Sequence, residues 1–158
     1  MADDSRPRAR TGEERKADAL EKLGERHADV WVASASSSGS PHLVPLSLAW
    51  DGERVILVGE PSAVTVRNII ASGTARLGLG PTRDIVMIDA VLDAVVEVGD
   101  ADTDTMIGET FARQADWDPR GAGEDFVFLL LRPRRMQVWR EANEIAGRTV
   151  MRDGAWLH

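Results

Sequence analysis

The segment Asp84–Val98, with the sequence DIVMIDAVLDAVVEV, carries the clearest structural pattern in the chain. From position 86 onward every even-numbered residue in it is apolar, whereas the odd positions include Asp89, Asp93 and Glu97. Strict alternation over this length predicts a single β-strand with one buried face. A strand of about 15 residues exceeds the usual length, so we expect it to curl as the strands of a barrel do.

Shorter segments on both sides of this strand predict an α+β domain. The remaining strands are expected at 30–35, 42–50, 55–58, 75–79, 126–131 and 136–140, and helices at 12–27, 62–72 and 103–115. Pro133 is expected to interrupt the last two strands, and the tail from Glu144 is mixed. Six or seven strands, mostly consecutive and antiparallel, with a few short helices predict a barrel rather than a parallel dinucleotide-binding sheet.

The strand at 42–50 carries the most specific local signals. Val44, Leu46, Leu48 and Trp50 share one face, and Asp51-Gly52 predicts a tight turn into a hairpin. Pro45 cannot donate a hydrogen bond to a neighbouring strand. We therefore expect Pro45 at a sheet edge, at a bulge, or where another group lies against the backbone.

The predicted helices have recognisable ends. Thr11 to Glu14 has the Thr-x-x-Glu pattern of a capping box, and His27 is expected to cap the end of the same helix. Ser62 is the expected N-cap of the helix at 62–72, and Gly73 its stop. Among the tryptophans, Trp31 and Trp50 are expected in the core.

Composition bounds the class of protein. The 158 residues suit one domain, which we place at 12–158 after a charged, disordered leader at 1–11. The net charge of −7 argues against a nucleic-acid-binding face, and no apolar run is long enough to cross a membrane. Cysteine is absent, which excludes disulfides, thiolate metal sites and cysteine nucleophiles. A cytoplasmic protein is therefore expected.

Most catalytic and metal-binding motifs are missing. The three histidines His27, His42 and His158 have no paired spacing, and no serine lies in a Gly-x-Ser-x-Gly elbow, so we predict no metal site and name no catalytic residue. Gly78-Leu79-Gly80 begins like a dinucleotide fingerprint, but Arg83 occupies the position of the third glycine.

One anion site remains. Ser62, Ala63, Val64, Arg67 and Asn68 place a hydroxyl, free backbone N–H groups and an arginine at a helix start, where phosphate groups bind. The alternative is a capped helix whose arginine forms a surface ion pair.

Two further residues extend this hypothesis. Arg83 could add a second charge to the anion site, with a solvated loop arginine as the alternative. Trp139 could cover a flat ring, with ordinary packing at a sheet edge as the alternative.

The order and spacing of these segments resemble a known superfamily. The matching stretches are Ala33–Pro45, Trp50-Asp51-Gly52 with its return strand, Val66-Arg67-Asn68-Ile69, Ala75–Pro81, the long strand 84–98, and Pro133–Trp139. Together they resemble the FMN-binding split-barrel superfamily of pyridoxamine 5′-phosphate oxidase, and within it the actinobacterial flavin and deazaflavin oxidoreductases. The resemblance covers about residues 12–157 and rests on no single motif.

The resemblance implies a split β-barrel that forms a homodimer, with two cofactor sites between the subunits. Pro45, Leu46 and Ser47 would then lie along the ring of FMN or of the deazaflavin coenzyme F-420. Ser62, Ala63 and Arg67 would hold the phosphate, with Val64 and Asn68 beside them, and Trp139 would approach from the partner subunit.

Three functions remain open at this point. The first is an oxidoreductase that transfers hydride between the cofactor and a small, flat, electron-poor substrate. In such an enzyme the protein positions the cofactor ring, tunes the electronic properties of the ring and excludes water. The second is a cofactor or ligand carrier without turnover. The third is a structural dimer with an empty site. All three stay open because fold alone cannot separate these functions.

Overall fold

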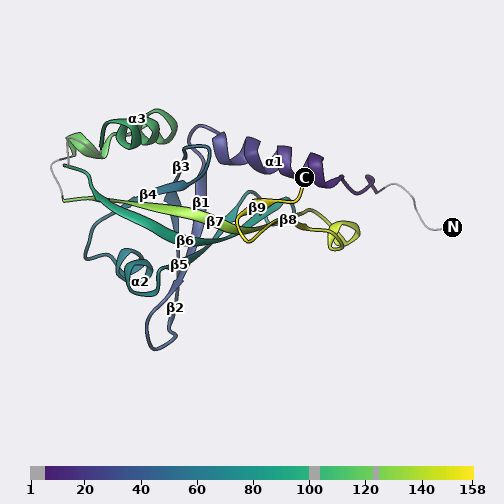
Figure 1. Cartoon of the computed structure of the whole chain (residues 1–158), viewed down its shortest axis with the longest axis horizontal. Coiled ribbons are helices and arrows are strands. Elements are labelled where there is room, and N and C mark those ends of the chain that lie inside the picture. Colours follow the sequence, from purple (N-terminus) through teal and green to yellow (C-terminus); the bar gives the residue numbers. More distant parts are fainter. Residues whose placement is uncertain (1–5, 100–103, 123–124) are drawn as a thin grey trace.

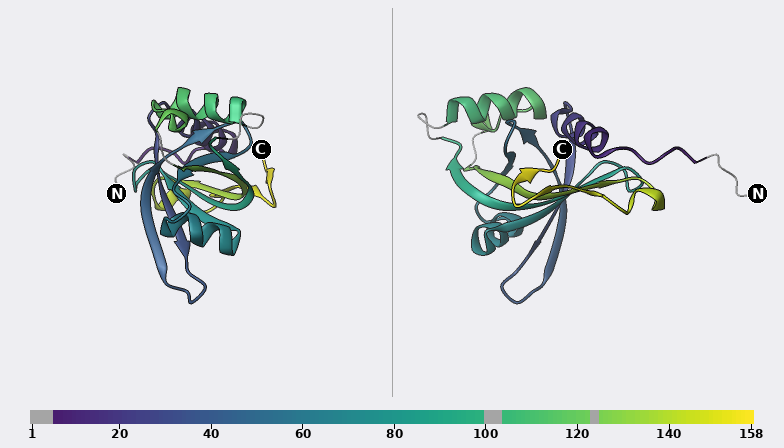
Figure 2. Two further views of the ribbon diagram at one scale, coloured as in Figure 1. Left: turned by 90° about the vertical axis from the view of Figure 1, so that its left-hand side faces the viewer. Right: turned by 45° about the vertical axis from the view of Figure 1, so that its right-hand side comes forward.

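A computed structural model describes residues 6–99, 104–122 and 125–158. Within these residues the chain forms one antiparallel sheet of nine strands, with three α-helices around it (Figure 1). Figure 2 shows α1 and α3 near one end of the molecule and α2 away from them, but α1 and α2 contribute side chains to the same apolar cluster and α3 to another. The prediction of an α+β fold built on a mostly antiparallel sheet is confirmed, although the sheet has more strands than the six or seven expected.

Two long strands form the middle of the sheet. Strand β6 (Ile85–Glu97) is the predicted alternating segment, and it pairs along its length with β7 (Val127–Trp139). The buried side chains of β6 occupy the even positions, as predicted. Asp93 is an extra residue at a bulge, since Leu92 pairs with Leu131 and Ala94 with Leu130. The bulge bends the strand, and the even positions beyond it face a different part of the core.

Strand β7 corrects one prediction. Residues 126–140 were expected as two strands interrupted at Pro133, but a single strand runs through this proline. Pro133 pairs with Ala90, whereas the preceding residue Asp89 pairs with Arg135. A second register shift therefore lies next to this proline. A bulge interrupts the hydrogen-bond ladder locally, so the missing N–H of proline costs little there.

The flanking strands follow the order β2-β1-β5-β6-β7-β4-β3. Their bounds are β1 Asp29–Ala35, β2 Pro41–Ser47, β3 Ala49–Trp50, β4 Val55–Gly59 and β5 Thr74–Leu79. The predicted strand at 42–50 is divided at Leu48, whose N–H donates to Ala28 O, so that β2 and β3 lie at opposite edges of the sheet. Pro45 therefore lies on an edge strand, as predicted. Among the described residues, strand pairing does not close the sheet into a barrel.

Two short strands were missed in the tail. Strand β8 (Thr149–Arg152) pairs with β7, and β9 (Ala155–Trp156) pairs with β8. Strands of two and four residues are too short to show an alternation that sequence reasoning could detect.

Helix α1 (Gly12–Gly24) has both hydrogen bonds of the predicted capping box between Thr11 and Glu14. It ends earlier than the predicted residue 27, so His27 is not its cap. His27 instead lies in the following turn with a φ of 59°, its side chain 3.8 Å from Asp116.

The other two helices correspond to the predicted ones. Helix α2 (Val64–Ser72) has Ala63 as its N-cap, which corrects the assignment of this position to Ser62. It stops at Gly73, which adopts the expected left-handed conformation with a φ of 72°. Helix α3 (Asp104–Ala115) matches the predicted one, whose first residue, Thr103, lies outside the described residues.

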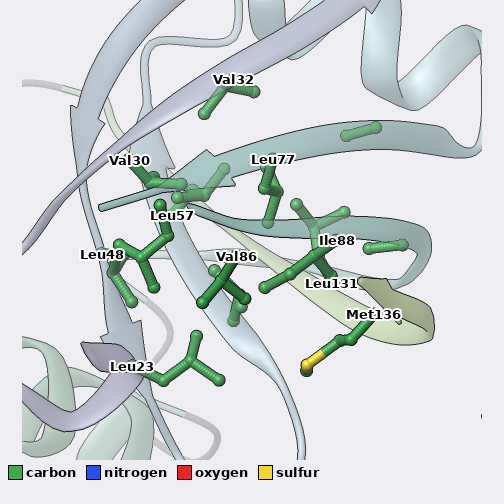
Figure 3. Packing of buried hydrophobic residues seen from close by; sticks show 14 of the residues in the cluster. Leu23, Val30, Val32, Leu48, Leu57, Leu77, Val86, Ile88, Leu131 and Met136 are labelled. Carbon is green, nitrogen blue, oxygen red and sulfur yellow. The ribbon is translucent and has the colours of Figure 1, made fainter. Parts of the chain in front are cut away.

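The apolar side chains form two adjoining clusters. The larger one lies within the curl of the sheet and includes Leu23 of α1, with Val30, Leu77, Ile88 and Leu131 from the strands (Figure 3). The smaller one lies under α3 and includes Phe111 and Phe128. Trp50 packs against the larger cluster, as predicted, but Trp31 is 53% exposed, so its placement in the core was wrong.

The domain boundary at residue 12 stays a prediction. Residues 1–5 of the expected leader lie outside the described residues, whereas Arg10 is buried against the domain. None of the helices described over 6–99, 104–122 and 125–158 is long and apolar enough to span a membrane.

Candidate functional site

The predicted ring-binding residues line a groove at the edge strand β2. Pro45, Leu46 and Ser47 form one wall of a space of about 380 Å³, together with Asp29 and Val58. Phe111 of α3 and Trp117 just after it form the other wall, and their rings meet edge to face with centroids 5.7 Å apart. The sequence offered no signal for these two aromatic residues, because the position of α3 over the sheet depends on tertiary packing.

The predicted phosphate-binding residues lie at the start of α2. Its N-cap Ala63 provides no side-chain hydrogen bond, and the first turn contains no acidic residue. The first hydrogen bond of the helix runs from Arg67 N to Ala63 O at 3.0 Å. The N–H groups of the turn before Arg67 therefore have no acceptor within the helix. These donors and the positive end of the helix dipole suit an anion.

Arg67 and Asn68 take different parts in this arrangement. The Arg67 side chain is exposed on the outer face of α2, and no carboxylate among the described residues lies within 4 Å of it. The surface ion pair considered as an alternative is therefore not formed there. Asn68 is buried, and its Nδ2 donates to Ser34 Oγ at 3.2 Å. Asn68 thus ties α2 to β1.

The two candidate regions belong to neighbouring elements. Helix α2 packs against β1, β2 and β5, with Val66 and Ile69 in the larger core. Gly59, the last residue of β4, approaches α2 so closely that a Cβ there would lie 2.6 Å from Val66 Cγ2. This close contact holds the start of α2 beside the strand that contributes Val58 to the groove.

Trp139 is not part of this arrangement within one chain. It ends β7, it pairs with Ile85, and the Arg148 guanidinium lies 5.8 Å from its ring centroid. Along the sheet, strands β1, β5 and β6 lie between β7 and β2. Trp139 is not among the residues that line the groove beside β2.

Arg83 does not contribute to the anion site. Its guanidinium pairs with the Glu141 carboxylate through Nε at 3.0 Å and Nη2 at 3.2 Å. In the chain, Arg83 follows β5, whereas the anion site lies at the start of α2, before that strand. In the described part of the chain, no group of three or more histidine and acidic side chains is arranged to hold a metal ion.

The outer face of the sheet beside the site is partly apolar. Trp31 of β1 pairs with Pro45, and Ala33 pairs with Leu43, so Trp31, Leu43 and Pro45 share this face. Trp31 is 53% exposed and Leu43 is 60% exposed. Large apolar side chains are usually buried, so this exposed group marks a surface suited to contact with another molecule.

No protein-family model and no curated protein matches the sequence. The structure, in contrast, matches many solved ones. An F420 reductase aligns with a TM-score of 0.59 at 20% identity, over 73% of this chain and 94% of its own. The chain has the split-barrel fold that these solved structures share. A Listeria innocua protein that carries the name pyridoxamine 5′-phosphate oxidase aligns at 16% identity with a TM-score of 0.57, over 82% of this chain and 98% of its own.

The split barrel is shared by proteins of different function. HutZ, the heme storage protein of Vibrio cholerae, aligns at 18% identity with a TM-score of 0.58, over 78% of this chain and 94% of its own. At this level of identity the likeness establishes the fold, and the function has to be argued from the residues of the site.

Proposed function

We propose that the protein binds FMN or the deazaflavin F-420 with its ring in the groove beside β2 and its phosphate at the start of α2. The proposal rests on one observation: a helix start with free N–H groups, and with an arginine that has no ion-pair partner among the described residues, lies beside an edge strand that contains a proline. The N–H groups and Arg67 suit the phosphate, and the edge of β2 suits a flat ring. The fold shared with an F420 reductase supports the same assignment.

When bound, such a cofactor would supply hydride transfer to a small, flat, electron-poor substrate. The chain's own residues would bind and orient it. Pro45 presents no N–H that water must solvate, so a ring can lie against this strand without leaving a donor unsatisfied. Phe111 and Trp117 would exclude water from the opposite side of the groove.

A second copy of the chain would complete the site. We propose a homodimer in which the partner subunit's Trp139 covers the ring, because Trp139 does not line the groove within one chain. The exposed Trp31 and Leu43 lie beside the groove and supply an apolar surface for such an interface. The lack of cysteine agrees with our assignment of the protein to the cytoplasm.

The test is a titration of the purified protein with FMN and, separately, with F-420, followed by cofactor fluorescence. We expect submicromolar binding of one of them. Binding of neither cofactor would refute the proposal, and tight binding would exclude a dimer with an empty site.

A single substitution locates the binding site. Arg67→Ala should weaken cofactor binding roughly tenfold to a hundredfold, since a hydrogen bond to a charged group contributes about 1.5–3 kcal/mol. The matched control is Arg83→Ala, which removes an exposed arginine that is paired with Glu141. Equal affinity of the two variants would show that Arg67 is only a surface residue.

A carrier without turnover is the second candidate, favoured by the shared fold of a heme storage protein. The two candidates differ in a simple measurement. Repeated turnover, in which an added chemical reductant reduces the bound cofactor and a nitroaromatic or quinone acceptor reoxidises it, beyond one equivalent of acceptor, would establish the enzyme and exclude the carrier.

A further inference from the structure

A second groove lies on the opposite part of the molecule, between the start of α1 and strands β7 and β8. It encloses about 640 Å³, and four arginines line it: Arg15, Arg135, Arg148 and Arg152. No aspartate or glutamate is among its lining residues in the described part of the chain. A local excess of positive charge is unexpected in a chain with a net charge of −7.

Arg15 gives the groove a buried positive charge. Its side chain is only 5% exposed, and an arginine stays protonated at any ordinary pH. The guanidinium donates to backbone carbonyls, namely Arg10 O at 3.1 Å and Glu144 O at 3.0 Å. Within the described residues no carboxylate lies within 4 Å of it, and a buried charge without a counter-ion is costly. An anion in the groove would offset that cost.

Two further guanidinium groups converge on one amide. With the Gln137 carboxamide oriented so that its oxygen faces donors, this oxygen accepts from Arg135 Nη2 at 2.8 Å and from Arg148 Nε at 3.3 Å. A neutral oxygen satisfies these donors but leaves two like charges close together. Arg135 reaches a carboxylate only at 3.8 Å, that of Asp89, which Arg76 also holds.

The remaining features define the size and polarity of a ligand. Arg152 is exposed and forms no ion pair among the described residues. Ile145 and Leu157, each 44% exposed, add apolar surface to the groove walls. The groove therefore combines several positive charges with apolar contacts, as a site for an organic anion requires.

We propose that this groove is a second binding site, for the phosphate group of a small organic molecule. Several converging guanidiniums favour a doubly charged group over a single carboxylate, and arginine matches phosphate oxygens with two hydrogen bonds at a time. Within one chain the groove is distinct from the site at α2, because no residue of β2 or α2 lines it.

Phenyl phosphate and inorganic pyrophosphate are suitable probes, measured by isothermal titration calorimetry at low salt on the intact protein. The wild type should bind both probes with micromolar to submillimolar affinity, and phenol should not bind. In the double variant Arg135→Gln/Arg152→Gln, affinity should fall roughly tenfold to a hundredfold for each arginine removed. Both residues are exposed, so the fold should persist, which circular dichroism would verify.

Two controls separate this site from others. Arg83→Gln removes an exposed arginine outside the groove and should leave both affinities unchanged. Arg67→Ala should also leave phenyl phosphate binding at the groove unchanged, even if it abolishes cofactor binding.

Trp139 provides a second readout, because Arg148 lies over its ring. Binding in the groove should change tryptophan fluorescence, and Trp139→Phe should remove that change. Absence of binding in the wild type, or loss of binding in Arg67→Ala with full binding in the double variant, would overturn the proposal.

Discussion

Glu144 is the residue on which the buried polar contacts of the domain converge. It is 2% exposed, and its carboxylate accepts from Arg10 Nε at 3.0 Å, from Arg10 Nη2 at 2.7 Å and from the Arg140 backbone N–H at 2.9 Å. The hydrogen bond from Arg10 outweighs the effect of burial and lowers the pKa of Glu144 from 4.5 to about 2. This pair fixes the segment before α1 to the segment after β7.

The lowered pKa predicts a particular loss of stability in acid. Because the folded-state pKa lies below the unfolded one, the stabilisation is complete above about pH 4.5 and is lost as the pH falls through 4.5 toward 2. Glu144→Gln should lower the free energy of unfolding at pH 7 by on the order of 3 kcal/mol, since Arg10 then loses its buried partner.

Urea unfolding of both proteins at pH 7, 4 and 3 would measure this effect. The difference in the free energy of unfolding between wild type and Glu144→Gln should shrink as the pH falls. Glu141→Gln is the control, because Glu141 pairs only at the surface with Arg83. A difference that stays constant from pH 7 to 3 would contradict the assignment.

Residue types predicted the position of Arg67 near a helix start, but they did not predict individual contacts. Arg67 was chosen correctly as an exposed arginine near a helix start, but the hydroxyl of Ser62 does not cap that helix. Trp31 was placed in the core because of its size. The small residues Val30 and Val32 point into the core, and Trp31 lies on the opposite face of the same strand. Which face of a short strand is buried depends on its partners.

At the scale of elements, the bulge at Asp93 determines how the sheet meets its two cores. Leu92 faces the larger cluster, whereas Ala94 and Val96 face the smaller one under α3. The Asp93 side chain is held at the surface by Arg132 at 3.1 Å and Arg54 at 3.4 Å. The extra backbone residue, more than its side chain, therefore maintains the fold at this point.

Two changes at position 93 separate the backbone from the side chain. Asp93→Ala should cost about 0.2–1 kcal/mol, because it removes only surface ion pairs. Deletion of Asp93 should prevent stable folding, because a register shift of one residue turns one half of β6 to the wrong face. Thermal unfolding by circular dichroism would compare the two. If the deletion variant melted within a few degrees of wild type, this account of the bulge would be incorrect.

Local sequence patterns predicted some helices and strands better than others. Strand β6 was predicted from its alternation alone, and α1 from its capping box, because both signals are local. The division at Leu48 and the passage of β7 through Pro133 depend on which strands become neighbours. No local pattern encodes that information.

At the scale of the whole molecule, the exposed face formed by Trp31, Leu43 and Pro45 predicts self-association. Light scattering after gel filtration should give twice the 17.2 kDa mass of the chain. Trp31→Asp/Leu43→Asp should yield a monomer, because the charges disfavour burial of this face. Both side chains are exposed in the single chain, so the monomer should remain folded. A wild-type monomer, or a dimeric variant, would exclude this interface.

The central position of β7 has a consequence for the synthesis of the protein. Strand β7 pairs with β6, β4 and β8, yet it begins only at Val127. While the ribosome is still producing earlier residues, β4 and β6 have apolar faces and unpaired edges with no strand between them. The nascent chain therefore cannot complete its sheet until β7 has emerged, and until that point its unpaired edges and apolar faces are prone to aggregation.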